Sequence, residues 1–590
     1  MKPISRNRKL HKINSFKRLL YLTKPHLKKI ILAALCVMIV NSAELLKPYI
    51  LKLVIDDFLI KKVSQNGIYS ITSMGIAYFA LAFIGGLSSF TQVNLINKAG
   101  QEIMRDLRKR VFRTIQFLPI PYLDKNSSGR LITRATNDVE ALSEMYTDVI
   151  ISLFKDVFLL IGIVYAMLTL DIKLAIISFS VVPIMFFIIF MLKNKIKQNF
   201  SKMKALIGKI NGFMAENISG MKIIQIFTGE KEKNDEFLKL NQEYLKSTLF
   251  QVRINSILRP AADVFQSLAV AIILWYSMGK IANHTIEIGV LFAFTTYIKQ
   301  FFNPISDLAD NYTTIQSALV SAERIFELLD EKNTLEDLDE GVSLKNLHGD
   351  IEFKNVWFSY NNSEWILKNV SFKVNKGQTF AFIGETGAGK TTIISLISGF
   401  YKIQKGEILI DGININDIKK RDLRKGISVV LQDVFLFSGD VKSNVILNDN
   451  ISENILNESL KTTCALDFVN GLPGGIHAKV MERGATFSAG QKQLLSFARA
   501  LAHSPSIFIL DEATSNIDTH TEKLIQKVIE EMAQNRTTLI IAHRLSTIRN
   551  ADKIVVLKHG EIIESGNHDE LICLEGYYKD MIQGDMKVAN

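Results

Sequence analysis

The sequence predicts a membrane-embedded α-helical bundle followed by an α/β domain, and three observations lead to this prediction. Hydrophobic residues make up 48% of the 590 residues and the mean hydropathy is +0.16, although 22% of the residues are charged. The apolar residues are concentrated before about residue 315, in stretches long enough to cross a bilayer. From about residue 347 short apolar strands alternate with helical patterns, which is typical of an α/β fold.

A basic segment, residues 1–29, precedes the first apolar stretch. The chain has a formal net charge of +11, and lysine and arginine are densest in this segment. A basic lead of this length exceeds that of an ordinary signal peptide and favours a cytoplasmic segment beside anionic lipid headgroups. We therefore expect membrane lipids, and no nucleic acid, as a partner.

Residues 30–327 form the predicted transmembrane domain, with six stretches long and apolar enough to be transmembrane helices. These stretches lie near 28–58, 68–97, 149–170, 173–193, 258–280 and 287–312. Polar residues inside such stretches are candidates for lining a transport pathway, although hydrogen bonding between helices explains them equally well. The candidates are Glu44, Lys47, Gln92, Asp263, Gln266 and Lys299.

The connections between these stretches differ in length and charge. Those near 59–67, at Asp171 and near 281–286 are short, whereas those over 98–148 and 194–257 are long and basic. By the positive-inside rule, the long connections and the N-terminus lie in the cytoplasm. Their helical apolar periodicity predicts long cytoplasmic extensions of the transmembrane helices.

A linker, residues 328–346, leads to the second domain, residues 347–590. Eight strands are predicted there, in one mixed sheet, at 351–358, 370–374, 379–383, 407–410, 427–431, 507–510, 538–541 and 553–557. The alternation of these strands with helical segments predicts an α/β domain.

The segment Gly384–Thr391, GETGAGKT, matches the phosphate-binding loop pattern GxxxxGK[ST]. It follows a predicted strand and precedes a helix that begins at Lys390, which is the context that this loop requires. Glycines let backbone N–H groups surround the phosphates of ATP, the lysine neutralises phosphate oxygens, and the Thr391 hydroxyl binds Mg²⁺. The predicted cofactor-binding residues here are Gly384, Thr386, Gly387, Ala388, Gly389, Lys390, Thr391 and Thr392.

Two carboxylates, Asp511 and Glu512, end the apolar strand at 507–510. In a phosphate-loop domain, the first carboxylate can hold the magnesium shell and the second can polarise a water molecule. The loop and the carboxylate pair together predict a P-loop ATPase domain with ATP and Mg²⁺ as cofactors.

Five further motifs make the chain resemble an exporter-type half-transporter of the ABC transporter family over nearly its whole length. They are FSAGQ at 487–491 (signature), Gln432 (Q-loop), Ser515–Asp518 (D-loop), His543 (switch histidine) and Tyr360 (the aromatic that stacks on adenine). By the same resemblance, the segments 121–129 and 227–237 are coupling elements that touch the ATPase domains.

The resemblance also implies a role for each site residue. Glu512 is the general base, His543 supports the γ-phosphate, Gln432 joins Thr391 and Asp511 at the magnesium ion, and Tyr360 stacks on adenine. In this family two ATPase domains enclose two ATP molecules, so Ser488, Gly490 and Gln491 contact the nucleotide held by the partner chain. One chain alone supplies only half of each site.

The signature departs from the usual LSGGQ, because Phe487 replaces leucine and Ala489 replaces the first glycine. Leu494 also stands where an arginine is usual. A chain with a deviant signature and intact catalytic residues resembles the catalytically intact subunit of bacterial heterodimeric multidrug exporters. We therefore expect a second ABC half-transporter as partner, and a different chain in preference to a second copy.

The expected function is ATP-driven export of a small hydrophobic or amphipathic substrate, such as a drug, lipid or peptide, by alternating access. The chain is expected in the cytoplasmic membrane, multi-pass, with the N-terminus and ATPase domain in the cytoplasm. An importer on the same fold and a homodimeric lipid flippase are the alternatives. A soluble ABC ATPase acting on DNA or ribosomes is a third class, against which the apolar stretches count.

Overall fold

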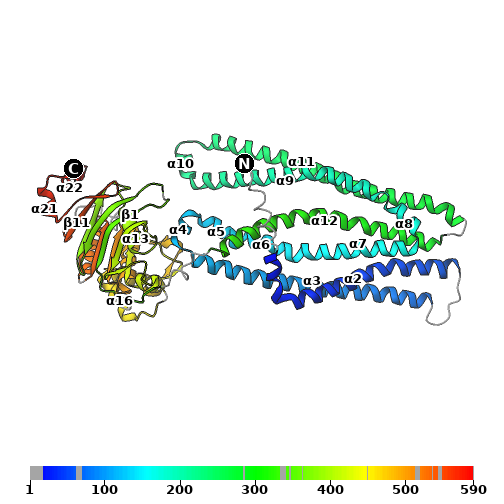
Figure 1. Cartoon of the computed structure of the whole chain (residues 1–590), viewed down its shortest axis with the longest axis horizontal. Coiled ribbons are helices and arrows are strands. Elements are labelled where there is room, and N and C mark those ends of the chain that lie inside the picture. Colours follow the sequence, from blue (N-terminus) through cyan, green and yellow to red (C-terminus); the bar gives the residue numbers. More distant parts are fainter. Residues whose placement is uncertain are drawn as a thin grey trace. The chain divides into compact units, whose positions relative to one another are not determined.

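The computed structural model describes residues 17–61, 70–282, 286–331, 341–344, 347–361, 363–447, 449–511, 519–534, 536–541 and 548–588. The chain forms two compact units (Figure 1). One comprises Met1–Arg113 and Gly129–Asp330, and the other comprises Thr114–Ser128 and Glu331–Asn590. The first is helical and the second contains the strands.

Six long helical stretches build the helical unit in the described part of the chain, as the sequence predicts. They are α2 (Leu27–Leu53) with the π-helix η2 (Val54–Ile60), α3 (Ile71–Gln116), α7 (Ile150–Leu170), α8 and α9 (Ile172–Phe179, Val182–Ser219), α11 (Glu230–Ala282) and α12 (Ile288–Leu329). Shorter helices are η1 (Lys24–His26), α5 (Ser128–Ala135), α6 (Asn137–Glu144), η3 (Met145–Val149) and α10 (Met221–Ile226).

By length and hydropathy, three helical segments of the described chain qualify as membrane spans: Lys24–Ile60, Ile71–Gln116 and Ser128–Leu170. Two shorter helical segments, Ile172–Met185 and Asp263–Met278, are also apolar. Helix α11 has 53 residues. At a rise of 1.5 Å per residue it is about 80 Å long, far more than the roughly 30 Å of a hydrocarbon core. The predicted extension of the helices beyond the bilayer is therefore confirmed.

The fourth predicted stretch is two helices rather than one. Asp171 caps the first of them, because its carboxylate accepts a hydrogen bond from Leu174 N at 2.8 Å. Helix α8 ends at Phe179, and α9 begins at Val182 with Pro183 in its first turn. Proline has no backbone N–H to donate to the preceding turn, and its ring clashes with that turn. Pro183 favours this break, although Pro48, Pro260 and Pro304 lie inside continuous helices. The structure therefore has two helices where one was expected over 173–193.

Helix α12 packs against α2, α6, α7 and α11, while α9 runs along α11 (Figure 1). The Tyr297 hydroxyl on α12 donates to Leu45 O on α2 at 2.6 Å. Of the polar pathway candidates, Lys47 and Glu44 form an ion pair with each other at 2.6 Å. Asp156, which was not one of the predicted pathway residues, is also a buried polar residue of the helical unit. It lies on α7 and accepts a hydrogen bond from Ser152.

The second unit contains two main sheets instead of the single sheet expected. One has the order β12-β11-β3-β10-β9-β6, in which β12 alone is antiparallel to its neighbour. The other is antiparallel, with the order β2-β1-β4-β5. A separate pair, β7-β8, completes the strands.

All eight predicted strands form, each within three residues of its expected ends. The strands are β1 (Ile351–Phe358), β2 (Leu367–Val374), β3 (Thr379–Gly384), β4 (Lys405–Ile410), β5 (Ile413–Asn414), β6 (Ile427–Val430), β7 (Gly439–Asp440), β8 (Lys479–Val480), β9 (Ile507–Asp511), β10 (Thr537–Ile541), β11 (Lys553–Lys558) and β12 (Glu561–Gly566).

The helices of this unit are α4 (Ile120–Lys125), α13 (Lys390–Ile397), α14 (Lys420–Lys425), α15 (Val441–Ile446), α16 (Glu453–Thr462), α17 (Leu466–Asn470), η4 (Gly475–His477), η5 (Glu482–Gly484), α18 (Ala489–Ala502), α19 (Thr519–Ala533), α21 (His568–Cys573) and α22 (Tyr577–Val588).

Strand β9 is buried on both faces of its sheet. Ile507 and Ile509 join a core that includes residues of both sheets, whereas Phe508 and Leu510 join a second core with α15 and α18. Because side chains alternate along a strand, a strand covered on both sides must be apolar at every position. Burial on both faces fixes the position of β9, whose carboxyl end forms part of the nucleotide-binding site described below.

Candidate nucleotide-binding site

The carboxyl ends of the parallel strands bring the predicted site residues to one edge of the sheet. Ile541 of β10 pairs with Phe382 of β3 on one side and with Asp511 of β9 on the other. The phosphate loop follows β3 directly, so it meets Asp511 at this edge. Val430 of β6 pairs with Leu510, which brings the loop containing Gln432 to the same edge.

The phosphate loop needs glycine where the structure places it. Gly384, Gly387 and Gly389 have φ values of +150°, +86° and +104°. A Cβ atom on Gly384 would lie 2.1 Å from Leu557 O, and one on Gly389 would lie 2.7 Å from Leu367 Cδ2. Gly389 is also the N-cap residue of α13. The loop therefore ends at a helix N-terminus, which favours phosphate binding.

The ammonium group of Lys390 lies over the loop. Lys390 is 6% exposed, and its Nζ donates to Gly384 O at 2.6 Å and to Glu385 O at 3.1 Å. These bonds hold a positive charge beside the backbone that would surround the phosphates. Thr391 is exposed and Thr392 is buried, so the two hydroxyls differ in their access to solvent.

Tyr360 belongs to an aromatic cluster beside this loop. Its ring meets those of Phe358 and Tyr401 edge to face, with both centroid distances 4.9 Å. Its hydroxyl lies 3.2 Å from Thr392 Oγ1. An aromatic ring fixed in this way could stack on a base while its hydroxyl contacts the helix of the phosphate loop.

Sequence reasoning missed Tyr401 of this cluster, whereas its partner Asp124 lies in the segment 121–129 that was expected to touch the ATPase domains. The Tyr401 hydroxyl donates to the carboxylate of Asp124 on α4, which is 277 positions away in the chain. Burial and this bond raise the pKa of Tyr401. No local pattern marked Tyr401, because its partner lies 277 positions away in the chain.

The three magnesium ligands expected from the sequence differ in their exposure to solvent. Asp511 is 8% exposed at the end of β9, and Gln432 is exposed after β6. With Thr391 they offer a carboxylate, an amide and a hydroxyl oxygen, which are hard donors that suit Mg²⁺. Among the described residues, no three His, Cys, Asp or Glu side chains form a metal site by themselves. Phosphate oxygens of the nucleotide would have to complete the coordination.

Three further predictions concern residues that the structure does not describe. Glu512, the D-loop Ser515–Asp518 and His543 lie outside the described residues. Their roles stay predictions that rest on the sequence.

The signature residues begin helix α18. Ser488 and Gln491 form a capping box, in which Gln491 N donates to Ser488 Oγ at 3.2 Å and Ser488 N donates to Gln491 Oε1 at 3.0 Å. Gly490 is buried, whereas Ser488 and Ala489 are exposed at this helix N-terminus. The positive end of the helix dipole is therefore open to an anion.

Two of the three departures from the usual signature serve packing. The Phe487 ring lies 6.3 Å from that of Phe468, and Phe487 is 8% exposed. Leu494 is 5% exposed in the same hydrophobic core. Ala489 is the departure that changes the exposed surface of the signature.

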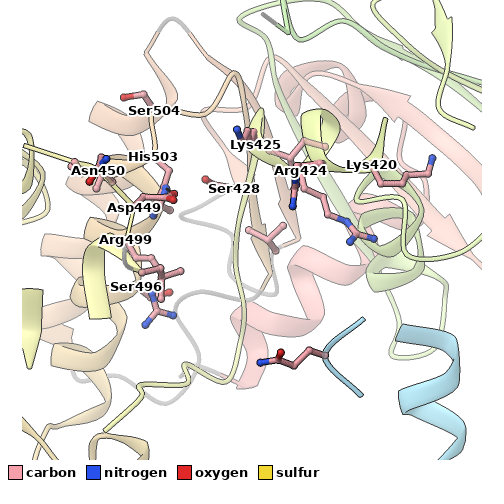
Figure 2. Close-up of a pocket in the computed structure, with 18 of the residues that line it drawn as sticks. Lys420, Arg424, Lys425, Ser428, Asp449, Asn450, Ser496, Arg499, His503 and Ser504 are labelled. Atoms are coloured by element: carbon pink, nitrogen blue, oxygen red, sulfur yellow. Dashed lines mark ion pairs between the residues drawn. The ribbon is translucent and has the colours of Figure 1, made fainter. Parts of the chain in front are cut away.

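A separate cavity of about 1080 Å³ lies in the same unit, and none of the predicted site residues is among the described residues that line it (Figure 2). Its walls come from α14, β6 and α18. Lysine and arginine side chains are frequent among its lining residues: Lys420, Arg421, Arg424, Lys425 and Arg499. Burial, with Lys402 and Arg424 nearby, lowers the pKa of Lys420 to about 8.

A helical membrane unit joined to a phosphate-loop ATPase unit defines the class of ATP-driven membrane transporters. The family model described as "ABC transporter transmembrane region" matches residues 30–305, and the model described as "ABC transporter" matches residues 367–515. The chain belongs to the ABC transporter family. It is a multi-pass membrane protein whose cytoplasmic ATPase domain couples ATP hydrolysis to transport, and half-transporters of this kind work as dimers.

Relatives and a solved structure match over most of the chain. An ATP-binding/permease protein of Bacillus subtilis whose name assigns it to multidrug resistance is 40% identical, covering 85% of this chain and 76% of the relative. An ATP-dependent lipid A-core flippase of Syntrophus aciditrophicus is 34% identical, covering 96% and 94%. The structure of a bacterial Atm1-family ABC exporter with ATP bound is 26% identical, with a TM-score of 0.79, covering 95% of this chain and 98% of that chain.

Proposed function

We propose that this chain is one half of an exporter that uses ATP hydrolysis to move a small hydrophobic or amphipathic molecule out of the cell. The observation that carries the proposal is the fusion of long apolar helices to an ATPase unit with an intact phosphate loop. The names of two relatives, for multidrug resistance and for lipid A-core flipping, support a drug or a lipid as substrate.

In this proposal the site residues have separate tasks. The backbone of Gly384–Gly389 and the ammonium of Lys390 bind the phosphates, Tyr360 stacks on adenine, and Thr391, Asp511 and Gln432 hold Mg²⁺. Glu512 acts as general base toward the attacking water, and His543 contacts the γ-phosphate. The bound magnesium ion would neutralise charge that develops on the phosphates during hydrolysis.

Inside-out membrane vesicles test the proposal. ATP should drive uptake of an amphipathic fluorescent dye or a labelled lipid into such vesicles, and Glu512→Gln should abolish this uptake while ATP binding remains. Uptake into right-side-out vesicles, with ATP enclosed inside them, would favour the importer instead. Retention of hydrolysis in Glu512→Gln would contradict the assigned base.

We further propose that the partner is a different half-transporter. The departure at Ala489 supports this, because the altered signature would face a nucleotide held by the other chain. Co-purification of the tagged Glu512→Gln chain, followed by measurement of the intact mass of the complex, tests it. Recovery of a complex that contains only this chain would favour a homodimer, such as a lipid flippase.

A further inference from the structure

The C-terminal segment of the chain reaches the phosphate loop through one side chain. Tyr577, the first residue of α22, donates its hydroxyl hydrogen to Glu385 Oε1 at 2.5 Å. Glu385 is the second residue of the phosphate loop and is exposed. The two residues are 192 positions apart.

Tyr577 is held in place by three neighbouring groups. Glu564 of β12 accepts from Tyr577 N at 2.6 Å and from Tyr578 N at 3.0 Å, so one carboxylate binds two N–H groups at the start of α22. Tyr578 is fully buried, and its hydroxyl lies 2.7 Å from His568 Nδ1. Lys558 Nζ lies 4.4 Å from the centre of the Tyr577 ring. The phenol is therefore presented to the loop by a fixed backbone.

Glu385 links this contact to the lysine of the loop. Its backbone carbonyl accepts a hydrogen bond from Lys390 Nζ at 3.1 Å, while its carboxylate accepts from Tyr577. A carboxylate next to a polyphosphate site repels the phosphates, and it can also compete with them for a nearby ammonium group. The orientation of the Glu385 side chain therefore matters for nucleotide affinity.

We propose that Tyr577 is a positioning residue for the phosphate loop, which keeps the Glu385 carboxylate away from the nucleotide phosphates and from Lys390. We name this contact the C-terminal clasp, formed by Tyr577 and Glu385. The inference rests on the proposed function, because it requires the loop to bind ATP. The hydrogen bond from Tyr577 to Glu385 also raises the pKa of Tyr577 to about 12, from a usual value of about 10.

A double-mutant cycle on the full-length chain in detergent tests the clasp. Tyr577→Phe keeps the ring beside Lys558 and removes only the donor. We expect it to raise the Kd for Mg-ATP about three- to tenfold, because 1.4 kcal/mol corresponds to tenfold and a hydrogen bond to a charged group is worth about that much. The Kd is measured by displacement of trinitrophenyl-ATP.

Glu385→Ala removes the carboxylate that the clasp restrains. We expect its Kd for Mg-ATP to equal that of the unmodified chain or to be lower. Adding Tyr577→Phe to Glu385→Ala should then change nothing further, because the partner of the phenol is gone. A tyrosine that supports the fold alone would weaken ATP binding equally in both backgrounds, and that result would overturn the clasp.

A control variant and the unmodified chain separate failure of the clasp from failure of the proposed function. Glu575→Gln is the matched control, since Glu575 is an exposed carboxylate in the same segment that pairs with Lys579 at 2.7 Å. It should bind Mg-ATP as the unmodified chain does. An unchanged Kd in Tyr577→Phe would overturn the clasp alone, whereas no ATP binding by the unmodified chain would overturn both the clasp and the proposed function.

Discussion

Gly384 is the residue at which strand β3 turns into the phosphate loop, and it has no room for a side chain. A Cβ atom there would lie 2.1 Å from Leu557 O, at a φ of +150° that other residues rarely adopt. Gly384→Ala should shift the backbone of the loop, at a cost of about 1–3 kcal/mol typical of overpacking, and should weaken Mg-ATP binding more than tenfold. Displacement of trinitrophenyl-ATP measures this.

Gly387 is the matched control in the same loop. Its φ is +86°, but a Cβ atom there would meet no heavy atom within 4 Å. Gly387→Ala should therefore cost only about 1–2 kcal/mol of backbone strain. If both alanine variants weaken ATP binding equally, the contact with Leu557 is not what requires glycine at position 384.

Lys420 makes the stability of the ATPase unit depend on pH. It is 8% exposed, its Nζ donates to Ile415 O, and its pKa is lowered to about 8 from 10.5, mainly by burial. Between pH 8 and pH 10.5 the unfolded chain then binds more protons than the folded chain, so this residue makes stability rise with pH in that window. The full effect is on the order of 3 kcal/mol.

Lys420→Met should remove this part of the pH dependence. Thermal unfolding of the full-length protein in detergent at pH 7.5 and pH 10 gives the slope for each variant. Lys425→Met, on the same helix, is the control and should keep the slope. An identical slope in Lys420→Met and the unmodified chain would mean that Lys420 titrates in the folded protein as it does in water.

Helix α4 is bound to the ATPase unit through the hydrogen bond between Asp124 and Tyr401. Tyr401→Phe removes the donor but keeps the ring that packs against Tyr360 and Phe358. A net stabilisation of about 1 kcal/mol for such a bond predicts roughly fivefold faster hydrogen exchange. Hydrogen-exchange mass spectrometry of residues 114–128 measures it.

Asp124→Ala should have the same effect as Tyr401→Phe, and the two together should have no larger one. Lys125→Gln changes a charge at the next position and serves as the control. Unaltered exchange in both single variants would show that other contacts hold α4. Because Tyr401 also touches Tyr360, this contact places part of the long first connection beside the proposed adenine site.

Some elements could be predicted from the sequence and others could not. The strand at 351–358 matches its predicted bounds. Buried residues alternate on either side of Asn355, where the register with β2 shifts. Strand β12 was missed because Glu561 and Glu564 interrupt its apolar pattern. In the structure it pairs with β11 at the edge of the sheet. The apolar residues continue across the break after Phe179, so hydrophobicity alone does not mark it, although Pro183 lies in the first turn of α9.

At the scale of the whole chain, local motifs were enough to predict the class of protein. The domain bounds and the roles of the residues at the sheet edge stay predictions. The contacts of Tyr577 with Glu385 and of Tyr401 with Asp124 join positions 192 and 277 apart. The resemblance indicated the segment that contains Asp124, but no local pattern marks Tyr401 or Tyr577. The motifs can be recognised in the sequence because nucleotide binding restricts the residue types at each of their positions. These two contacts depend instead on how helices and strands pack.

One chain carries one phosphate loop and one signature, so the partner determines what the signature does. Ala489 is exposed as the first residue of α18, where the capping box of Ser488 and Gln491 fixes the helix start. In the proposed dimer this surface faces the nucleotide bound to the other chain. The added Cβ atom should hold the α18 N-terminus away from the γ-phosphate and slow hydrolysis there.

Ala489→Gly should therefore raise hydrolysis at the nucleotide bound to the partner and leave unchanged the nucleotide bound to this chain. Vanadate trapping of a photoreactive ATP on the purified complex, with the two chains separated on a gel, shows which chain is labelled. Ala485→Gly, before the signature, is the control and should change neither label. Increased labelling of this chain alone would mean that the signature acts on its own phosphate loop, which the proposed pairing of two half-transporters forbids.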